Sequence, residues 1–265
     1  MLRLLPFAAL LGGLILSASA QAVDVDPATY GYPITNPFEA TIATTPPEMR
    51  PLLPDEDDIN QSDYTLSLRP EREFILPANF WAVKKLTYRM AKQDHPAPLM
   101  FLIAGTGAAY DSSLNEYLKK LFYQEGYHVV QLSSPTSYDF MSAASRLATP
   151  GISQYDAEDL YHVMQAVRAQ QAKVPVTDYY LAGYSLGALD AAFVSHLDET
   201  RKSFNFKKVL MLNPPVNLFT SISNLDKLVQ TEVKGINNST TFYELVLGKL
   251  TRYFQDKGRV DLNAA

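Results

Sequence analysis

The sequence predicts an α/β fold, a mostly parallel sheet with helices on both faces. Its 265 residues are 47% hydrophobic and 19% charged, a composition that can bury an ordinary core and excludes a disordered chain. Between residues 98 and 212, strand-like and helix-like segments alternate at least three times, which is typical of parallel strands joined by helices. Two of the strand-like segments are continuous apolar runs, as expected for strands buried on both faces.

The first 22 residues are predicted to be a secretory signal peptide. They combine a basic start at Arg3, an apolar run over residues 4–16 and small residues at Ala18 and Ala20. This run is shorter than the about 20 residues of a typical membrane-spanning helix. An uncleaved N-terminal anchor is the alternative. After signal cleavage we expect a periplasmic or secreted protein without a stable membrane span, and a chain free of cysteine suits such a compartment.

An extended N-terminal arm is predicted over residues 23–63. This segment has neither a helical nor a strand period, and residues 44–58 are rich in proline and acidic side chains. A plain tether is favoured, and a segment that binds a partner in extended form is the alternative. We assign residues 64–265 to one domain, with its core over 98–213 and a helical, cap-like segment over 214–265.

The elements of this domain follow from their hydrophobic patterns. Residues 64–68 and 81–88 alternate in character and predict an antiparallel pair at a sheet edge. Further strands are predicted over residues 98–105, 127–132, 178–182 and 207–212, the first and last of them as buried runs. Helices are predicted over residues 113–125, 153–171, 186–197, 222–230 and 241–254. The first helix is expected to gather on one side its apolar residues Leu114, Tyr117, Leu118, Leu121 and Phe122.

A serine flanked by glycines stands between the predicted strand 178–182 and the helix that follows it. The motif reads Gly183-Tyr184-Ser185-Leu186-Gly187, a G-x-S-x-G in the strand-to-helix position of a nucleophile elbow. A serine in such a tight, strained turn presents its hydroxyl clear of the sheet. Glycines two positions away keep side chains from colliding with the neighbouring strand and helix. Ser185 is therefore the candidate nucleophile.

Through this motif the chain resembles the α/β-hydrolase family, over residues 98–213. The resemblance implies an oxyanion hole that joins the backbone N–H of Leu186 to a second N–H from the loop after an earlier strand. The matching loop is at residues 104–107, where Gly105 or Thr106 is expected to supply the second donor. A tight strand-to-helix turn with no ligand is the alternative for this loop.

The resemblance also implies a histidine base downstream of Ser185, and none is identified. His196 is the one histidine there, eleven residues along the predicted helix. At 1.5 Å per residue that is about 16 Å away, beyond hydrogen-bond reach. The other three histidines are expected at the wrong end of the sheet or in mid-helix: His95, His128 and His162.

The acid of the triad is not identified either. After the last predicted strand, where some members of the family carry it, the residue is Asn213, which has no charge to stabilise an imidazolium. Asp190 and Asp198, on the helix after the motif, are expected to face solvent. The sequence also stops at Ala265 without the two further strands that the resemblance leads us to expect.

Three interpretations of the incomplete triad stay open. The chain is the front part of a longer protein, or a hydrolase-like protein that keeps Ser185 but binds without cleaving, or an enzyme with an unusual base from another subunit or an N-terminal residue. The function that the resemblance implies is hydrolysis of a small-molecule or lipid ester through Ser185, once a base and an acid are supplied. A catalytically inactive binding or scaffold protein in the periplasm is the alternative.

Composition bounds the remaining partners. The formal net charge is -5, whereas surfaces that bind nucleic acid need clustered Lys and Arg, so nucleic acid is not expected as a partner. The lack of cysteine removes disulfides, thiolate zinc sites and a thiol nucleophile. No metal or dinucleotide motif occurs, and no cofactor is expected. The sequence leaves the oligomeric state open.

Overall fold

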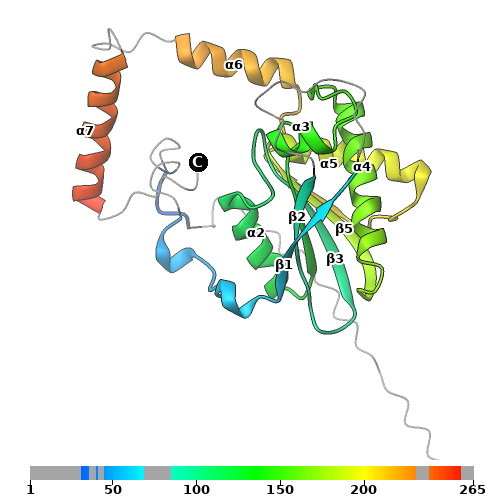
Figure 1. Ribbon diagram of the computed structural model, residues 1–265. Coiled ribbons are helices and arrows are strands. Elements are labelled where there is room, and N and C mark those ends of the chain that lie inside the picture. Colours follow the sequence, from blue (N-terminus) through cyan, green and yellow to red (C-terminus); the bar gives the residue numbers. More distant parts are fainter. Residues whose placement is uncertain (1–30, 36–39, 41–44, 69–84, 231–238, 258–265) are drawn as a thin grey trace, which may run out of the picture. The chain divides into compact units, whose positions relative to one another are not determined.

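Six strands form one mixed sheet within the residues that the computed structural model describes, which are 31–35, 40, 45–68, 85–230 and 239–257 (Figure 1). Their order across the sheet is β1-β2-β4-β3-β5-β6. The strand bounds are β1 Gln61–Leu66, β2 Leu86–Ala91, β3 Ala97–Ile103, β4 His128–Leu132, β5 Val176–Tyr184 and β6 Val209–Leu212. The helices are α2 Ser113–Gln124, α3 Tyr138–Ala143, α4 Ser153–Gln170, α5 Leu186–Arg201, α6 Leu218–Gln230 and α7 Ser239–Lys257. Two short 3-10 helices, η1 Pro47–Met49 and η2 Glu56–Asp58, precede the sheet.

The sheet is parallel from β4 through β3 and β5 to β6, as the alternation of strands and helices predicts. The antiparallel pair at the edge is also confirmed: β1 pairs with β2, and β2 runs antiparallel to β4. Its bounds differ from those predicted, because β1 begins at Gln61 and β2 begins at Leu86, and residues 81–84 lie outside the described residues.

Each face of the sheet packs against its own set of helices. Alternate residues of β3 point to opposite faces, so Met100 and Leu102 pack with α2, whereas Phe101 and Ile103 pack with α3, α4 and α5. All residues of β3 except Pro98 are buried, in agreement with the continuous apolar run. Helices therefore lie on both faces, which gives the predicted α/β architecture (Figure 1).

The buried side of α2 differs from the predicted one. Leu114 and Tyr117 are 41% and 40% exposed, whereas Asn115 and Lys119 are fully buried. Leu118 packs into the core as expected, and Leu121 and Phe122 pack against it. The helix thus turns two polar side chains toward the sheet. The Lys119 ammonium group donates to Gln61 of β1, and the Asn115 amide nitrogen donates to the Tyr110 carbonyl before α2 and, at 3.5 Å, to the Leu132 carbonyl of β4.

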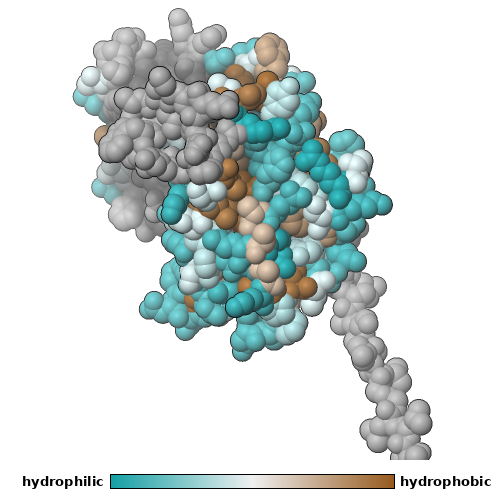
Figure 2. Space-filling view, turned by 45° about the vertical axis from the view of Figure 1, so that its right-hand side comes forward, coloured by the Kyte–Doolittle hydropathy of each residue, from teal (hydrophilic) through white to brown (hydrophobic). Residues whose placement is uncertain are grey.

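The last described strand is more exposed than its apolar sequence suggests. Leu210 and Met211 of β6 are 43% and 47% exposed, so the prediction of a buried strand is wrong. The reason is that β6 is the outermost strand among the described residues, with a neighbour on one side only. On the face drawn in Figure 2, hydrophilic residues prevail and hydrophobic ones form smaller patches between them.

The C-terminal helices agree with the helical pattern read for residues 214–265. α6 and α7 extend the two predicted helical segments by a few residues at their ends. Their function as a cap stays a prediction. The short helix α3, which starts after Ser137, is a finding that the hydrophobic pattern did not indicate; Ser137 accepts a hydrogen bond from the backbone of Phe140 and thereby caps the helix.

A buried lysine ties the residues before the sheet to α2. The Lys119 ammonium group donates hydrogen bonds to Glu56 (3.0 Å), Gln61 (2.7 Å) and Glu116. Burial alone would raise the pKa of Glu56, but hydrogen bonds from Gln61 and Lys119 and the nearby lysine charges together lower it to about 2. The boundary that we predicted between arm and domain at residue 63 falls inside β1, and the residues just before it are fixed on α2.

Removal of this ammonium group should destabilise the fold. Lys119→Met keeps much of the side-chain volume but leaves Glu56 and Glu116 without their buried partner, and we expect a loss of about 3 kcal/mol in the free energy of unfolding. Lys120→Met is the matched control, because Lys120 makes one 3.4 Å contact with Glu56 from a more exposed position, and we expect at most about 1 kcal/mol there. Urea unfolding measures both. Equal losses in the two variants would contradict a special stabilising role of the buried Lys119 ammonium group.

Candidate active site

Ser185 occupies the sharp turn that joins β5 to α5. Its backbone lies at φ 53° and ψ -125°, a conformation that L-residues rarely adopt. The side chain is exposed, and no described residue forms a hydrogen bond with its hydroxyl group. The serine therefore stands clear of the sheet, with its backbone in the strained form that the motif predicts.

Two glycines of the motif make this turn sterically possible. A methyl group on Gly183 would lie 2.2 Å from the carbonyl oxygen of Gly187 and 2.8 Å from the backbone nitrogen of Ala188. A methyl group on Gly187 would lie 2.4 Å and 2.5 Å from the carbonyl oxygens of Ala104 and Ile103. Both obstacles are backbone atoms, which cannot swing away as a side chain can. The start of α5 is thus in direct contact with the ends of β3 and β5.

The loop after β3 lies against the serine. A methyl group built on Gly105 would come within 2.7 Å of the Tyr184 ring and 3.2 Å of the Ser185 Cβ atom. The Tyr184 hydroxyl group in turn lies 3.1 Å from the Ser112 hydroxyl group at the start of α2. Gly105 therefore lies close to Tyr184 and the candidate nucleophile, and the absence of a side chain allows that approach.

Backbone N–H groups near Ser185 are left without partners. Leu186 is the first residue of α5, so its N–H has no acceptor within the helix. In the part of the chain that the structure describes, the N–H groups of Gly105 and Thr106 also have no hydrogen-bond acceptor. The N-terminus of α5 adds the positive end of a helix dipole to these donors. Such a set of donors suits an anionic oxygen beside Ser185.

The rest of this loop is firmly anchored, through residues that the sequence analysis did not single out. The N–H of Gly107 donates to the Thr136 hydroxyl oxygen at 2.7 Å. The N–H of Tyr110 donates to the Ser133 hydroxyl oxygen at 2.9 Å, and its carbonyl accepts from Asn115 and Gln131 at 3.0 Å each. The only signal in the sequence is the polar run directly after the strand at 127–132.

None of the chain's four histidines, all of which lie in the described residues, forms a hydrogen bond with Ser185. His95 and His196 are exposed and lie against Asp94 and Glu199. His128 is buried at the amino end of β4, where its Nδ1 atom accepts from the backbone of Gln93. Burial lowers the pKa of His128 below its usual range. His162 is exposed in α4.

Asp198 is buried, and the prediction that it faces solvent is wrong. It is 4% exposed because α4 packs against this side of α5. Its carboxylate accepts hydrogen bonds from the Tyr161 hydroxyl group at 2.7 Å and from the backbone N–H groups of Phe204 (3.0 Å) and Phe206 (3.2 Å). Asp198 thus fixes the chain between α5 and β6.

Asp190 is also buried rather than exposed, at 1%. Its Oδ2 atom has no hydrogen-bond partner among the described residues. Burial, with a smaller contribution from the charge of Asp156, raises the pKa of Asp190 to about 8. Asp156, at the start of α4, is itself buried, and burial raises its pKa although the backbone of Gly151 donates to it. Asp190 is therefore mainly protonated at neutral pH.

Two further features, a metal-binding cluster and a membrane-spanning helix, are not seen within the described ranges. No group of three or more His, Cys, Asp or Glu side chains is placed there to hold a metal ion. No helix in the same ranges has the length and apolar character that crossing a membrane requires.

The sheet, its two helical layers and the serine at the turn from β5 into α5 define an α/β-hydrolase-like fold. No known family model matches the sequence, and no curated protein matches it. Solved structures do match. A brefeldin A esterase, described as a bacterial homologue of human hormone-sensitive lipase, is 17% identical with a TM-score of 0.44, and the match covers 72% of this chain and 51% of the esterase.

Two further esterases are similar to the chain to about the same degree. A thermostable esterase from Pseudomonas putida is 14% identical with a TM-score of 0.44, over 63% of this chain and 47% of its own. A hyperthermophilic esterase from the archaeon Pyrobaculum calidifontis is 19% identical with a TM-score of 0.41, over 63% of this chain and 46% of its own. The chain spans about half the length of these solved structures.

The strained backbone at Ser185 should be measurable as lost stability. Ser185→Gly relieves a strain of about 1–3 kcal/mol, of which about 0.5–1 kcal/mol is offset by the greater freedom of glycine in the unfolded chain. Ser185→Ala keeps the Cβ atom and therefore the strain. We expect the glycine variant to be more stable than the alanine variant by about 1 kcal/mol in urea unfolding. An alanine variant as stable as the glycine variant would argue against strain at this turn.

Because of Asp190, the free energy of unfolding should decrease as pH rises. Its folded pKa of about 8 lies above the usual value of about 4 in unfolded chains. The folded state therefore keeps a proton that the unfolded state loses, and stability that is complete below about pH 4 is lost progressively up to about pH 8. Asp190→Asn removes this titration.

The test is urea unfolding of the natural protein and Asp190→Asn at pH 5 and pH 8. We expect the natural protein to lose on the order of 3 kcal/mol more than the variant between these two values. Asp178→Asn, at a partly exposed aspartate near Lys207, is the control and should follow the natural protein. Parallel pH profiles for Asp190→Asn and the natural protein would contradict the buried, protonated carboxyl group.

Proposed function

We propose that this chain carries the nucleophile and the oxyanion hole of a serine hydrolase that cleaves acyl esters. The observation that carries the proposal is the exposed Ser185 in its strained turn, with unpaired N–H groups of Leu186 and of the Gly105–Thr106 segment beside it. A purely structural turn gains nothing from a serine in this backbone conformation. Acyl transfer needs this combination of an accessible hydroxyl group and donors for a developing negative charge.

In the proposed reaction, the Ser185 Oγ atom attacks the carbonyl carbon of the ester. The carbonyl electron pair moves onto the oxygen, which the N–H groups of Leu186 and Thr106 or Gly105 stabilise, while a base takes the serine proton. The pair then returns, the alcohol leaves with a proton, and Ser185 holds the acyl group as an ester. Water repeats the sequence on this ester and releases a carboxylic acid.

The base and the acid of this reaction come, in this proposal, from outside the described residues. The four histidines are all described, and each has a position or a partner away from Ser185. Asn213 follows β6 where an acid is expected, and its amide group carries no charge. A group in another part of the polypeptide or on a second subunit would have to complete the proton transfer.

Export would set the substrate class. We propose that residues 1–22 are a signal peptide and that the protein acts in the periplasm or outside the cell. Free esters and lipid esters are available there, whereas coenzyme A thioesters are confined to the cytoplasm. A small-molecule or lipid ester is therefore the proposed substrate.

A binding protein without catalysis is the second candidate. The observation that favours it is the lack of a described histidine near Ser185, which leaves the serine hydroxyl group with no base to activate it. In that case the N–H groups beside Ser185 would hold a carbonyl or carboxylate group of a ligand without attack on it.

Chemical rescue separates the two candidates. The purified chain is mixed with p-nitrophenyl acetate, with and without added imidazole as a diffusible base, and intact-protein and peptide mass spectrometry follow acetylation of Ser185. A general base typically contributes 10²–10⁴-fold, so we expect imidazole to accelerate Ser185 acetylation by at least about 10²-fold. Ser185→Ala should not respond, and Ser195→Ala, on the same helix, should respond as the natural protein does.

Two outcomes of this experiment would contradict Ser185 as the nucleophile. If folded protein takes up no acetyl group on Ser185 at any imidazole concentration, or acetylation is the same on other serines, the nucleophile assignment fails. Retention of p-nitrophenyl ester or of a carboxylate by such a protein would then favour the binding function.

A further inference from the structure

A buried histidine joins chain segments at the amino edge of the sheet, opposite the edge that carries Ser185. His128 is the first residue of β4, and its side chain is fully buried. Its Nδ1 atom accepts the backbone N–H of Gln93, in the connection from β2 to β3, at 3.0 Å. Its Nε2 atom lies 3.2 Å from the carbonyl oxygen of Pro175, in the connection from α4 to β5. The imidazole ring thus bridges two connections that are distant in sequence.

These two contacts require the neutral form of the ring. A backbone N–H group can only donate, so Nδ1 carries no hydrogen, and a carbonyl oxygen can only accept, so Nε2 carries one. A second proton on Nδ1 would place two N–H groups opposite each other and would break the hydrogen bond with Gln93. His128 can therefore hold Gln93 only while the ring is uncharged.

The surroundings of His128 oppose a positive charge on the ring. Burial has the largest effect, and three cationic groups act in the same direction: Lys92 and His95 in the connection from β2 to β3, and Arg168 in α4. The carbonyl group of Pro175 favours the charged ring, but by less than burial opposes it. The pKa of His128 is therefore lowered below its usual value.

Other titratable groups on the neighbouring elements have partners of their own. The Tyr179 hydroxyl group of β5 accepts from Arg168 at 2.8 Å, and the Tyr123 hydroxyl group of α2 donates to the Lys92 carbonyl at 3.5 Å. The carboxylate of Asp94 pairs with His95 on the surface. Among the described residues, none of these groups bonds to the His128 ring, so none of them stabilises its charged form directly.

Gln93 extends this contact to a third connection. Its side-chain amide group donates to the carbonyl oxygens of Tyr123 (2.8 Å) and Tyr127 (3.1 Å), between α2 and β4. The backbone before it is held by the hydrogen bond from the Lys92 N–H to the Asn60 carbonyl at 2.8 Å. Residues 94–96, which follow, are exposed. The contact with His128 is therefore a main anchor of this short connection on the side that leads to β3.

We propose that His128 is an acid-sensitive latch, which holds the connection from β2 to β3 at Gln93 while its ring is neutral and releases it when Nδ1 takes up a proton from solvent. The release is local, because β3 stays paired with β4 and β5. The latch does not depend on the proposed esterase function.

The lowered pKa of His128 sets the direction of the effect. The unfolded chain takes up the proton at a higher pH than the folded one does. The contribution of His128 to stability is thus complete above about pH 6.5 and is lost as pH falls toward the lower pKa of the folded state.

Nuclear magnetic resonance of the natural full chain tests the latch. Two-bond nitrogen–proton correlations report the tautomer and the titration of the ring, and hydrogen exchange reports the protection of the Gln93 amide. We expect the Nε2–H tautomer at pH 7.5 and a titration midpoint below about 6.5. The protection factor of Gln93 should fall at least about tenfold as the ring gains its proton, because that N–H loses its acceptor. The amides of β3 should keep their protection.

Two substitutions separate charge from packing. In His128→Asn the Oδ1 atom stands as many bonds from Cα as Nδ1 does in histidine, so it can accept the Gln93 N–H without titrating. We expect Gln93 protection in this variant to be the same at pH 7.5 and pH 5. His128→Leu has no acceptor and should have protection at least about tenfold lower at both values. His162→Asn, at an exposed histidine of α4, should behave as the natural protein does.

Three results for the natural protein would overturn the latch, and they apply even if the variants do not fold. A ring with its hydrogen on Nδ1 at pH 7.5, or a midpoint at or above about 6.5, would contradict the contacts on which it rests. Unchanged Gln93 protection through the titration of the ring would show that the proton releases nothing. A loss of protection shared by the amides of β3 would indicate unfolding of the whole domain instead of a local release.

Discussion

The site depends on one steric constraint, the contact of the first turn of α5 with the carbonyl ends of β3 and β5. A methyl group at Gly183 or Gly187 would lie 2.2–2.5 Å from backbone carbonyl oxygens, so these elements could not come together with larger residues. This contact holds Ser185 at φ 53°, which costs of the order of 1–3 kcal/mol locally. The packing of β3, β5 and α5 in the buried core holds the turn in this conformation and offsets its energetic cost.

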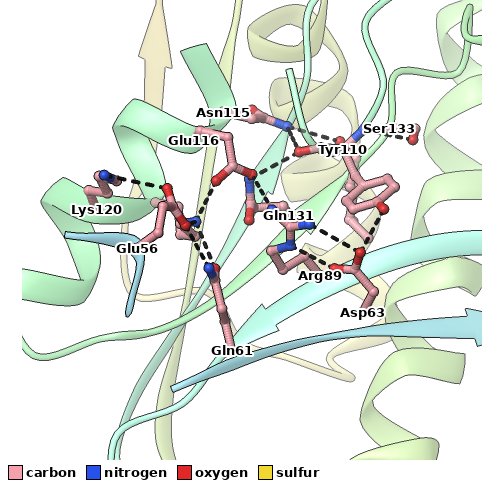
Figure 3. A network of polar contacts seen from close by, with 12 residues as sticks. Glu56, Gln61, Asp63, Arg89, Tyr110, Asn115, Glu116, Lys120, Gln131 and Ser133 are labelled. Carbon is pink, nitrogen blue, oxygen red and sulfur yellow. Dashed lines mark hydrogen bonds and ion pairs between the residues drawn. The ribbon is translucent and has the colours of Figure 1, made fainter. Parts of the chain in front are cut away.

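The same constraint fixes where the loop after β3 must run, and polar contacts decide its shape. Gly105 lies against Ser185, so the loop begins beside the serine; it then leaves along Tyr110 toward α2. Gln131 bonds both to the Tyr110 carbonyl and to Glu116, which also pairs with Arg89 and Lys119 (Figure 3). A hydrogen-bonded path therefore joins the residues before the sheet, at Glu56, to the loop beside Ser185. The Gln131 amide nitrogen is satisfied twice on this path, whereas its Oε1 atom has no hydrogen-bond partner among the described residues.

Local patterns predicted most of the fold and the centre of the site, whereas long-range partners set the rest. The apolar run of β3 and the G-x-S-x-G turn are properties of adjacent residues, so the sequence was sufficient for both. Lys119 and Asp190 are charged residues on helices, and nothing nearby in sequence indicates that packing buries them. Thr136 lies 29 residues from Gly107, so no local pattern indicates the hydrogen bond between them. The exposure of β6 likewise depends on which strands lie beside it.

The geometry separates two parts of serine-hydrolase chemistry that are usually treated as one. Stabilisation of an oxyanion by Leu186 and the Thr106 segment needs only backbone groups at the ends of β3, β5 and α5, all of which are in place. Proton transfer needs a side chain whose pKa suits it, and none of the four histidines forms a hydrogen bond with Ser185. Because the backbone donors do not depend on the base, they keep their geometry in its absence. In serine hydrolases generally, the oxyanion hole and substrate binding alone retain about 10³–10⁴-fold of catalysis. The chain's own backbone thus supplies the donors of the proposed site, and the proposed ester hydrolysis would additionally need a base to take the proton of Ser185.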